Sequence, residues 1–134
     1  MPNDELTEKI LEACVEVSRE LGIGFAESVY ENALALALKQ KGLRVENQVP
    51  LVIRFRGVIV GEFCADLLVE DRVLIELKTV AYFAEEHFAQ MLNYVKATET
   101  EIGLIVNFGV PRLEYRKFKN HCVEANSLAD FFKN

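Results

Sequence analysis

The chain has few cysteines, and their arrangement excludes two kinds of site. Cys14, Cys64 and Cys122 are scattered, odd in number and never form a Cys-x-x-Cys pair. This argues against a disulfide framework and against a zinc site. We expect buried, reduced thiols. Cys64 lies two residues before Asp66, so we expect it to line a site without acting as a nucleophile.

The chain also lacks a long hydrophobic run and an excess of positive charge. Its longest apolar run, Ala33 to Leu38, is far shorter than the roughly 18 residues that span a bilayer. The polar, acidic start does not resemble a signal peptide, so a cytoplasmic protein without a membrane partner is expected. The net charge of −6 counts against tight, sequence-independent binding to a long duplex. Nucleic acid would have to be bound by local basic patches.

The hydrophobic periodicity predicts one α/β domain over residues 1–134. Helices are expected over 4–21, 26–41 and 84–98, with a short closing helix over 128–132. Strands are expected over 44–55, 58–69, 73–80, 102–107 and 113–118. This order predicts a central mixed sheet, in which an antiparallel three-stranded meander is followed by a crossover helix and a further strand, with helices on its faces.

Three charged residues interrupt the apolar strands in the middle of the chain: Asp66, and then Glu76 and Lys78. Burying an unpaired charge is costly, so these residues need a reason to be there. A three-residue loop over 70–72 would place Asp66 opposite Glu76, whereas a two-residue turn would put them on opposite faces. Only the first register keeps the charges out of the core, so we predict that the two carboxylates meet.

Two carboxylates about 5 Å apart repel each other, and one tends to take up a proton. A divalent cation removes that repulsion. Oxygen ligands without clustered His or Cys favour Mg²⁺ or Mn²⁺ over zinc. The alternative is a cross-strand salt bridge between Lys78 and the acids, which would neutralise only one of the two carboxylates.

At these positions the sequence resembles the PD-(D/E)XK nuclease superfamily, which has the restriction-endonuclease-like fold. Asp66 and Glu76-Leu77-Lys78 match its D…E-x-K core, with Ala65 where the superfamily usually has proline. Residues 24–30, Gly-Phe-Ala-Glu-Ser-Val-Tyr, resemble the signature of its GxxExxY branch. Residues 90–94 and 102–109 resemble the closing blocks of the same branch.

The resemblance implies a metal-dependent nuclease that hydrolyses phosphodiester bonds with Mg²⁺-activated water. Asp66 and Glu76 would hold Mg²⁺ or Mn²⁺, and Lys78 would position or activate the water. Glu27 is similar to the helical acid of the superfamily and is predicted as a further metal ligand and catalytic residue. A favourable charge at a helix start is its alternative explanation.

Gln90 and Tyr94 are four residues apart on a predicted helix, so they share one face. The superfamily's Q-x-x-x-Y pattern implies that Gln90 belongs to the catalytic site and that Tyr94 contacts nucleic acid. The alternative is a polar helix face with a half-buried tyrosine. Tyr30 is expected to pack, His87 to lie at the surface or cap a helix, and Asn107 to form a turn.

A basic cluster near the end of the chain is the candidate for holding phosphates: Arg112, Arg116, Lys117 and Lys119. The interleaved Tyr115 and Phe118 suit base stacking, but a solvated edge strand has the same sequence pattern. The implied partner is nucleic acid, DNA ahead of RNA, and so small a nuclease would often form a homodimer to grip a duplex. The alternative function is a catalytically inactive domain of this fold that binds nucleic acid or protein.

Overall fold

The computed structural model describes residues 4–119, which fold into a mixed α/β arrangement. The helices are α1 (Glu5–Leu21), α2 (Glu27–Gln40) and α3 (Glu85–Thr98). The strands are β1 (Val45–Phe55), β2 (Val58–Val69), β3 (Val73–Lys78), β4 (Ile102–Asn107) and β5 (Glu114–Lys119). They form one sheet in the order β1-β2-β3-β4-β5, with β3 parallel to β4 and the other neighbours antiparallel. The predicted fold class is confirmed; the helix predicted over 128–132 lies outside the described residues.

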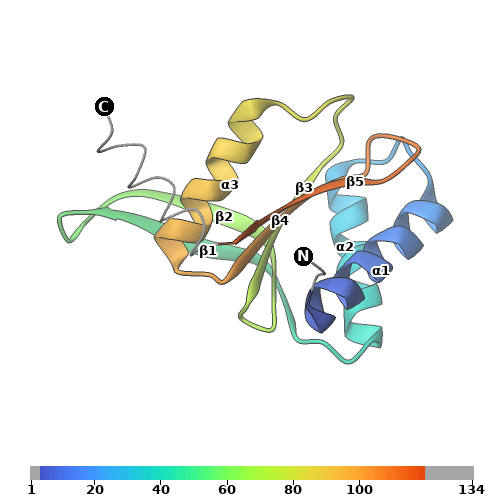
Figure 1. Ribbon diagram of the computed structural model, residues 1–134, viewed down its shortest axis with the longest axis horizontal. Helices are drawn as coiled ribbons and strands as arrows, with labels where there is room; N and C mark the ends of the chain where they lie inside the picture. Colours follow the sequence, from blue (N-terminus) through green and yellow to red (C-terminus); the bar gives the residue numbers. More distant parts are fainter. Residues whose placement is uncertain (1–3, 120–134) are drawn as a thin grey trace.

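Helices cover both faces of the sheet, as Figure 1 shows, with α1 and α2 on one side and α3 on the other. Alternate strand residues such as Leu67, Ile75 and Leu77 pack against α1 and α2. Strand alternation predicts Ala65 on the same face as Leu67, but it packs in the cluster around Met91 of α3. Between these two residues the β1–β2 ladder is interrupted at Asp66, opposite Gln48, so the alternation is not continuous there.

The buried stripe of α1 includes Cys14, as the periodicity predicts. Burial raises the pKa of the Cys14 thiol to about 12, so it remains protonated and packs as a small apolar group. The expectation of a buried thiol is wrong for Cys64, which is exposed. Its strand neighbours Phe63 and Ala65 pack against α3, so the Cys64 side chain lies on the opposite face of β2. Cys122 is outside the described residues.

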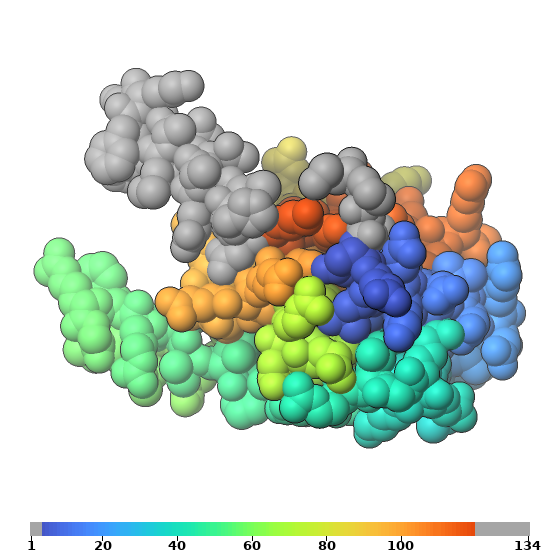
Figure 2. Space-filling view, turned by 60° about the horizontal axis from the view of Figure 1, so that its bottom comes forward, coloured from blue at the N-terminus to red at the C-terminus, as the bar shows by residue number. Residues whose placement is uncertain are grey.

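Beyond the body of the molecule, β1 and β2 continue as a two-stranded arm, residues 52–62, which projects on its own in Figures 1 and 2. The predicted turn at Arg56-Gly57 is present, and both residues have positive φ, 51° and 81°. Positive φ at both positions is the geometry of tight hairpin turns. No residue of the arm is buried, and its exposed apolar side chains include Phe55, Val58 and Val60.

The segment after β3 is fixed by the end of β4. The buried Asn107 side chain accepts hydrogen bonds through Oδ1 from the backbone N–H of Val80 (3.0 Å) and Gly109 (2.9 Å). Its Nδ2 donates to the Val80 carbonyl (2.8 Å), and the Phe108 N–H donates to the Lys78 carbonyl (2.8 Å). The turn role expected of Asn107 therefore extends to holding the chain that leaves Lys78.

A further expectation is met at the start of α3. His87 Nδ1 accepts a hydrogen bond from the Ala84 N–H at the start of α3, so this histidine caps its helix. Within residues 4–119, none of the helices has the length and apolar content that crossing a membrane requires.

Candidate active site

The strand register brings Asp66 and Glu76 together. Strands β2 and β3 are joined by the predicted three-residue loop, and their pairs are Val69 with Val73, Leu68 with Leu74, and Leu67 with Ile75. The same register places Asp66 opposite Glu76. The prediction that the two carboxyl groups meet is therefore confirmed, since their side chains hydrogen-bond to each other.

At this point, which we call the fork, β2 and β3 separate. The two carboxylates here accept hydrogen bonds from backbone N–H groups. The Leu77 N–H donates to Asp66 Oδ2 (2.8 Å) instead of to a carbonyl. The Asp66 N–H in turn donates to Glu76 Oε1 (3.4 Å). Beyond this fork β2 continues beside β1 toward the arm. The fork thus explains why acidic residues occur here, since each satisfies a backbone group that the opening sheet leaves unpaired.

The environment of the two carboxyl groups favours their protonation. Burial, and then the neighbouring Asp66 charge, raises the pKa of Glu76 to about 8. Burial also raises the pKa of Asp66, but the Leu77 N–H opposes that rise. The side chains hydrogen-bond to each other, with the proton favouring Glu76. At neutral pH the pair therefore carries about one negative charge, as expected for acids forced together.

Lys78 lies two residues after Glu76 and shares its side of the strand. Its charge lowers the pKa of both Asp66 and Glu76, so the ammonium is close to the pair. Nevertheless, no ion pair within 4.0 Å joins Lys78 to either acid in the described chain. The alternative of a structural salt bridge is therefore not what holds these residues together.

From α3, Tyr94 reaches the same region. Its ring stacks on Phe63 of β2 with centroids 3.7 Å apart. Burial and the nearby Glu76 raise the pKa of the Tyr94 hydroxyl, while a hydrogen bond with Gln90 opposes that rise. Gln90 itself is exposed. The structure thus brings Tyr94 to the carboxylate pair and Gln90 to Tyr94.

The acid that approaches the pair from α2 is Glu31. Glu27 begins α2, is exposed, and makes no hydrogen bond or ion pair with another described residue. One turn later, Glu31 Oε1 accepts a hydrogen bond from Gln48 Nε2 (2.7 Å). The same amide donates to Asp66 Oδ1 (3.4 Å), and the Glu31 charge raises the pKa of Asp66.

Glu31 and Gln48 were both missed from the sequence. The signal for Glu31 was its position four residues after Glu27, on the same face of the helix. Gln48 offered no such signal, because the pairing of β1 with β2 shifts by one residue between Ile53 and Arg54. A regular hairpin counted from the Arg56-Gly57 turn would have placed Gln48 opposite Ala65 and not opposite Asp66.

The basic cluster does not form one surface. Arg116 lies over the Phe88 ring of α3, with its guanidinium carbon 5.6 Å from the ring centroid. Lys117 points the other way, since its charge acts on Asp4 at the start of α1. Arg112 is exposed in the loop before β5, and Lys119 ends that strand. Strand alternation therefore puts Arg116 on one face of this edge strand and Lys117 and Lys119 on the other.

Tyr30 has the packing role expected for it. It is fully buried, and its ring stacks on Phe108 with centroids 4.9 Å apart. The hydroxyl donates to the Gly22 carbonyl (2.6 Å) and accepts from the Phe25 N–H (3.3 Å). The tyrosine of the Gly24–Tyr30 segment thus ties the α1–α2 loop to the end of β4.

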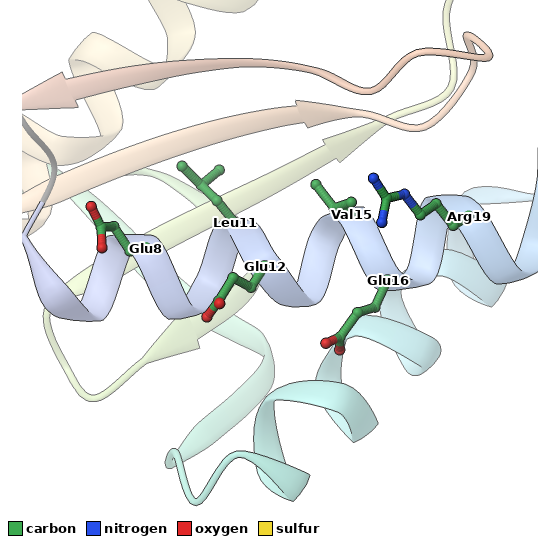
Figure 3. Close-up of a pocket in the computed structure, with 6 residues that line it drawn as sticks. All are labelled: Glu8, Leu11, Glu12, Val15, Glu16 and Arg19. Carbon is green, nitrogen blue, oxygen red and sulfur yellow. The ribbon is translucent and has the colours of Figure 1, made fainter.

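A hollow of about 470 Å³ lies away from the carboxylate pair, along the outer side of α1 (Figure 3). Three of its six lining residues are glutamates, which would repel phosphate. The site at the fork is therefore better identified by its chemistry than by this cavity, whose lining is Glu8, Leu11, Glu12, Val15, Glu16 and Arg19.

The sequence matches the model of the PD-(D/E)XK nuclease superfamily over residues 4–126. The chain belongs to this superfamily. Members of the superfamily generally use divalent metal ions. None of the curated proteins matches the sequence significantly. The narrower resemblance to the GxxExxY branch stays a prediction.

Two solved structures share the restriction-endonuclease-like fold of this PD-(D/E)XK chain. The crystal structure of SSO0001 has a TM-score of 0.55 and 17% identity, covering 97% of this chain and 68% of its own. An alkaline exonuclease (LHK-Exo) from Laribacter hongkongensis has a TM-score of 0.51 and 16% identity, covering 99% of this chain and 81% of its own. At these identities the likeness concerns the fold.

The residues at the fork fit a single hard cation. Asp66 and Glu76 offer carboxylate oxygens, and Mg²⁺ commonly binds one or two carboxylates and takes its other ligands from water and phosphate. Among residues 4–119, no three acidic, imidazole or thiol side chains are close enough to hold a metal by themselves. The Gln48 amide stands between Glu31 and the pair. Asp66 and Glu76 are thus the two residues that could ligate such an ion directly, with Glu31 nearby.

Proposed function

We propose that this PD-(D/E)XK protein is a nuclease that hydrolyses nucleic-acid phosphodiester bonds with the help of Mg²⁺ or Mn²⁺, with DNA as the preferred substrate. The observation that carries the proposal is the Asp66–Glu76 pair, two half-buried carboxyl groups brought together where β2 and β3 separate, beside Lys78. Such a pair is costly for a purely structural strand. The energetic cost of bringing two half-buried carboxyl groups together is offset if the pair binds a cation.

In this proposal Asp66 and Glu76 hold the ion, which when bound supplies Lewis-acid polarisation of a phosphate oxygen and a more acidic water. Lys78 orients the attacking water or stabilises the charge that develops on the phosphate. Tyr94, whose ring is fixed against Phe63, contacts the nucleic acid, and Gln90 supports it. The exposed Arg112 and Arg116 bind phosphates further along the strand.

The proposal includes a third acid, contributed by α2, and there are two candidates for it, Glu27 and Glu31. Glu27 is supported by the resemblance of residues 24–30 to the GxxExxY signature, and Glu31 by its hydrogen bond through Gln48 to the pair. Because both lie on one face of α2, the variants Glu27→Gln and Glu31→Gln are matched. The residue that serves the site is the one whose loss weakens Mn²⁺ binding.

The deciding experiment incubates the purified protein with single- and double-stranded DNA and RNA, with Mg²⁺, with Mn²⁺ and with chelator. We expect metal-dependent cleavage that falls roughly 100-fold or more in Lys78→Ala, as is typical when a charge-stabilising group is removed. Titration calorimetry with Mn²⁺ on the wild type and on Asp66→Asn measures the ion separately. We expect binding by the wild type and its loss in the variant.

Two outcomes would count against the nuclease. If the folded wild type takes up no Mn²⁺, the carboxylate pair is not a cation site. If it binds Mn²⁺ but its cleavage equals that of Lys78→Ala, the activity is a contaminant. Binding of DNA without cleavage would instead favour the alternative, a catalytically inactive domain of the same fold.

A further inference from the structure

Gln48 has a backbone conformation that its place in the fold does not require. Its φ is 49°, although it lies inside β1. The other non-glycine residues with positive φ in the described chain occur where the chain turns: Arg56, Glu70, Asp71 and, at the end of α3, Glu99. A residue with a Cβ atom is strained in this region, and glycine is the residue that relieves the strain.

The strained residue lies directly across from Asp66. Asn47 and Val49 are paired with β2 on either side, while Gln48 and Asp66, opposite each other, are left out of the ladder. The left-handed conformation therefore takes one residue of β1 out of the regular strand at the level of the carboxylate pair. Strain of this kind persists only where the surroundings hold it, and such residues are frequent at functional sites.

This backbone conformation places the side-chain amide of Gln48 between two carboxylates. Nε2 donates to Glu31 Oε1 at 2.7 Å and to Asp66 Oδ1 at 3.4 Å, so a single amide joins α2 to β2 through two carboxylates. The other oxygen of Asp66 is held by the Leu77 N–H. Both oxygens of the Asp66 carboxylate are thus restrained, one from each neighbouring strand.

We infer that Gln48 is a positioning residue, which holds the Asp66 carboxylate and the Glu31 charge beside it in the arrangement that binds a divalent cation. This inference rests on the proposed function of the Asp66–Glu76 pair. Outer groups that orient a metal's carboxylate ligands typically change metal affinity 10- to 100-fold when removed. The strain at Gln48 is then the cost of a side chain that glycine cannot supply.

The chain provides a matched control for this inference. Asn47 Nδ2 also donates to Glu31, through Oε2 at 3.1 Å, and is equally exposed, but no hydrogen bond joins it to Asp66 within the described residues. Replacing Asn47 therefore removes an amide from Glu31 and leaves Asp66 held. Replacing Gln48 removes one hydrogen bond from each acid, and leaves Asn47 bound to Glu31 and the Leu77 N–H bound to Asp66.

The test compares Gln48→Met, Gln48→Gly and Asn47→Ala with the wild type by Mn²⁺ titration calorimetry and thermal unfolding without metal. We expect the dissociation constant for Mn²⁺ to rise about 10-fold in both Gln48 variants and less than 2-fold in Asn47→Ala. Gln48→Gly should also unfold at a higher temperature than Gln48→Met, because it removes the strain along with the amide.

Other results of this test would contradict either the role of Gln48 or the proposed function. Wild-type affinity in the folded Gln48 variants, or an equal loss in Asn47→Ala, overturns the role of Gln48 and leaves the proposed function intact. No Mn²⁺ binding by the wild type overturns the proposed function and this inference with it. Unfolding curves identify a variant that has lost its fold, and the second Gln48 variant then decides.

Discussion

Among the described residues, Glu76 is the acid whose pKa the fold raises to about 8, far above its ordinary value of 4.5. Burial and the Asp66 charge are the main causes. A carboxyl whose pKa is raised on folding stabilises the folded state below its unfolded pKa, because the folded protein then binds the proton more tightly. That contribution is lost as the pH rises through the folded value.

We therefore predict that the protein without metal loses stability between about pH 4.5 and pH 8, by about 1.4 kcal/mol for each unit that the pKa is raised. In Glu76→Gln the amide can still donate to Asp66, so this part of the pH dependence should disappear. Chemical denaturation in the presence of chelator at pH 5 and pH 8 measures the difference. If the free energy of unfolding changes between pH 5 and pH 8 as much in the variant as in the wild type, the pH dependence comes from other groups.

For single residues, the sequence identifies those site residues whose charge conflicts with an apolar strand around them. Asp66, Glu76 and Lys78 could be identified because strand alternation puts three charges on one side of apolar strands. Gln48 could not, because a polar residue in an edge strand is ordinary. Its role depends on a backbone conformation and a register shift that local sequence does not encode.

Between elements, Gly109 marks a close approach of backbone to backbone, where the end of β4 meets the segment after β3. A Cβ atom on Gly109 would lie 2.6 Å from the Thr79 carbonyl carbon and 2.6 Å from the Val80 nitrogen, both backbone atoms. On Gly103, under α3, it would lie 2.5 Å from the sulfur of Met91. The backbone atoms near Gly109 cannot move aside easily, whereas the flexible side chain of Met91 can.

We predict that Gly109→Ala lowers the free energy of unfolding by about 1–3 kcal/mol or more, the range for overpacked sites. Gly103→Ala should cost less, because Met91 can change its rotamer. Urea denaturation of the two variants compares them directly. A larger loss in Gly103→Ala would mean that the helix layer is the more rigid contact. Since Gly109 borders the segment after Lys78, its variant should also reduce cleavage.

The elements themselves could be predicted closely. The predicted boundaries of the three described helices and of the strands over 44–69 differ from the observed ones by at most one residue, since glycines and hydrophobic periodicity mark them. The third strand ends at Lys78 and not at residue 80, because Asn107 binds the backbone of Val80 outside the ladder. A contact between segments so far apart in sequence is invisible to local patterns.

For the whole molecule, stability resides in the layered body and not in the arm. Val60 and Val69 belong to the same strand, yet Val60 is 61% exposed on the arm and Val69 is fully buried in the main core. We predict that Val60→Thr changes the free energy of unfolding by less than about 0.5 kcal/mol.

Val69→Thr should cost about 1–3 kcal/mol, because it buries a hydroxyl among apolar side chains. Urea denaturation measures both variants. Because threonine keeps the β-branched shape in each case, the comparison isolates burial. Equal losses at the two positions would show that the arm is packed against something in solution.

The proton shared by Asp66 and Glu76 has a last consequence. A divalent ion and a hydrogen ion compete for the same oxygens, so loading the site is an exchange in which one is taken up and the other passes to the buffer. The apparent affinity for the metal then increases with alkalinity until Glu76 is fully ionised. We therefore expect the proposed nuclease to be less active at acidic pH and more active at mildly basic pH.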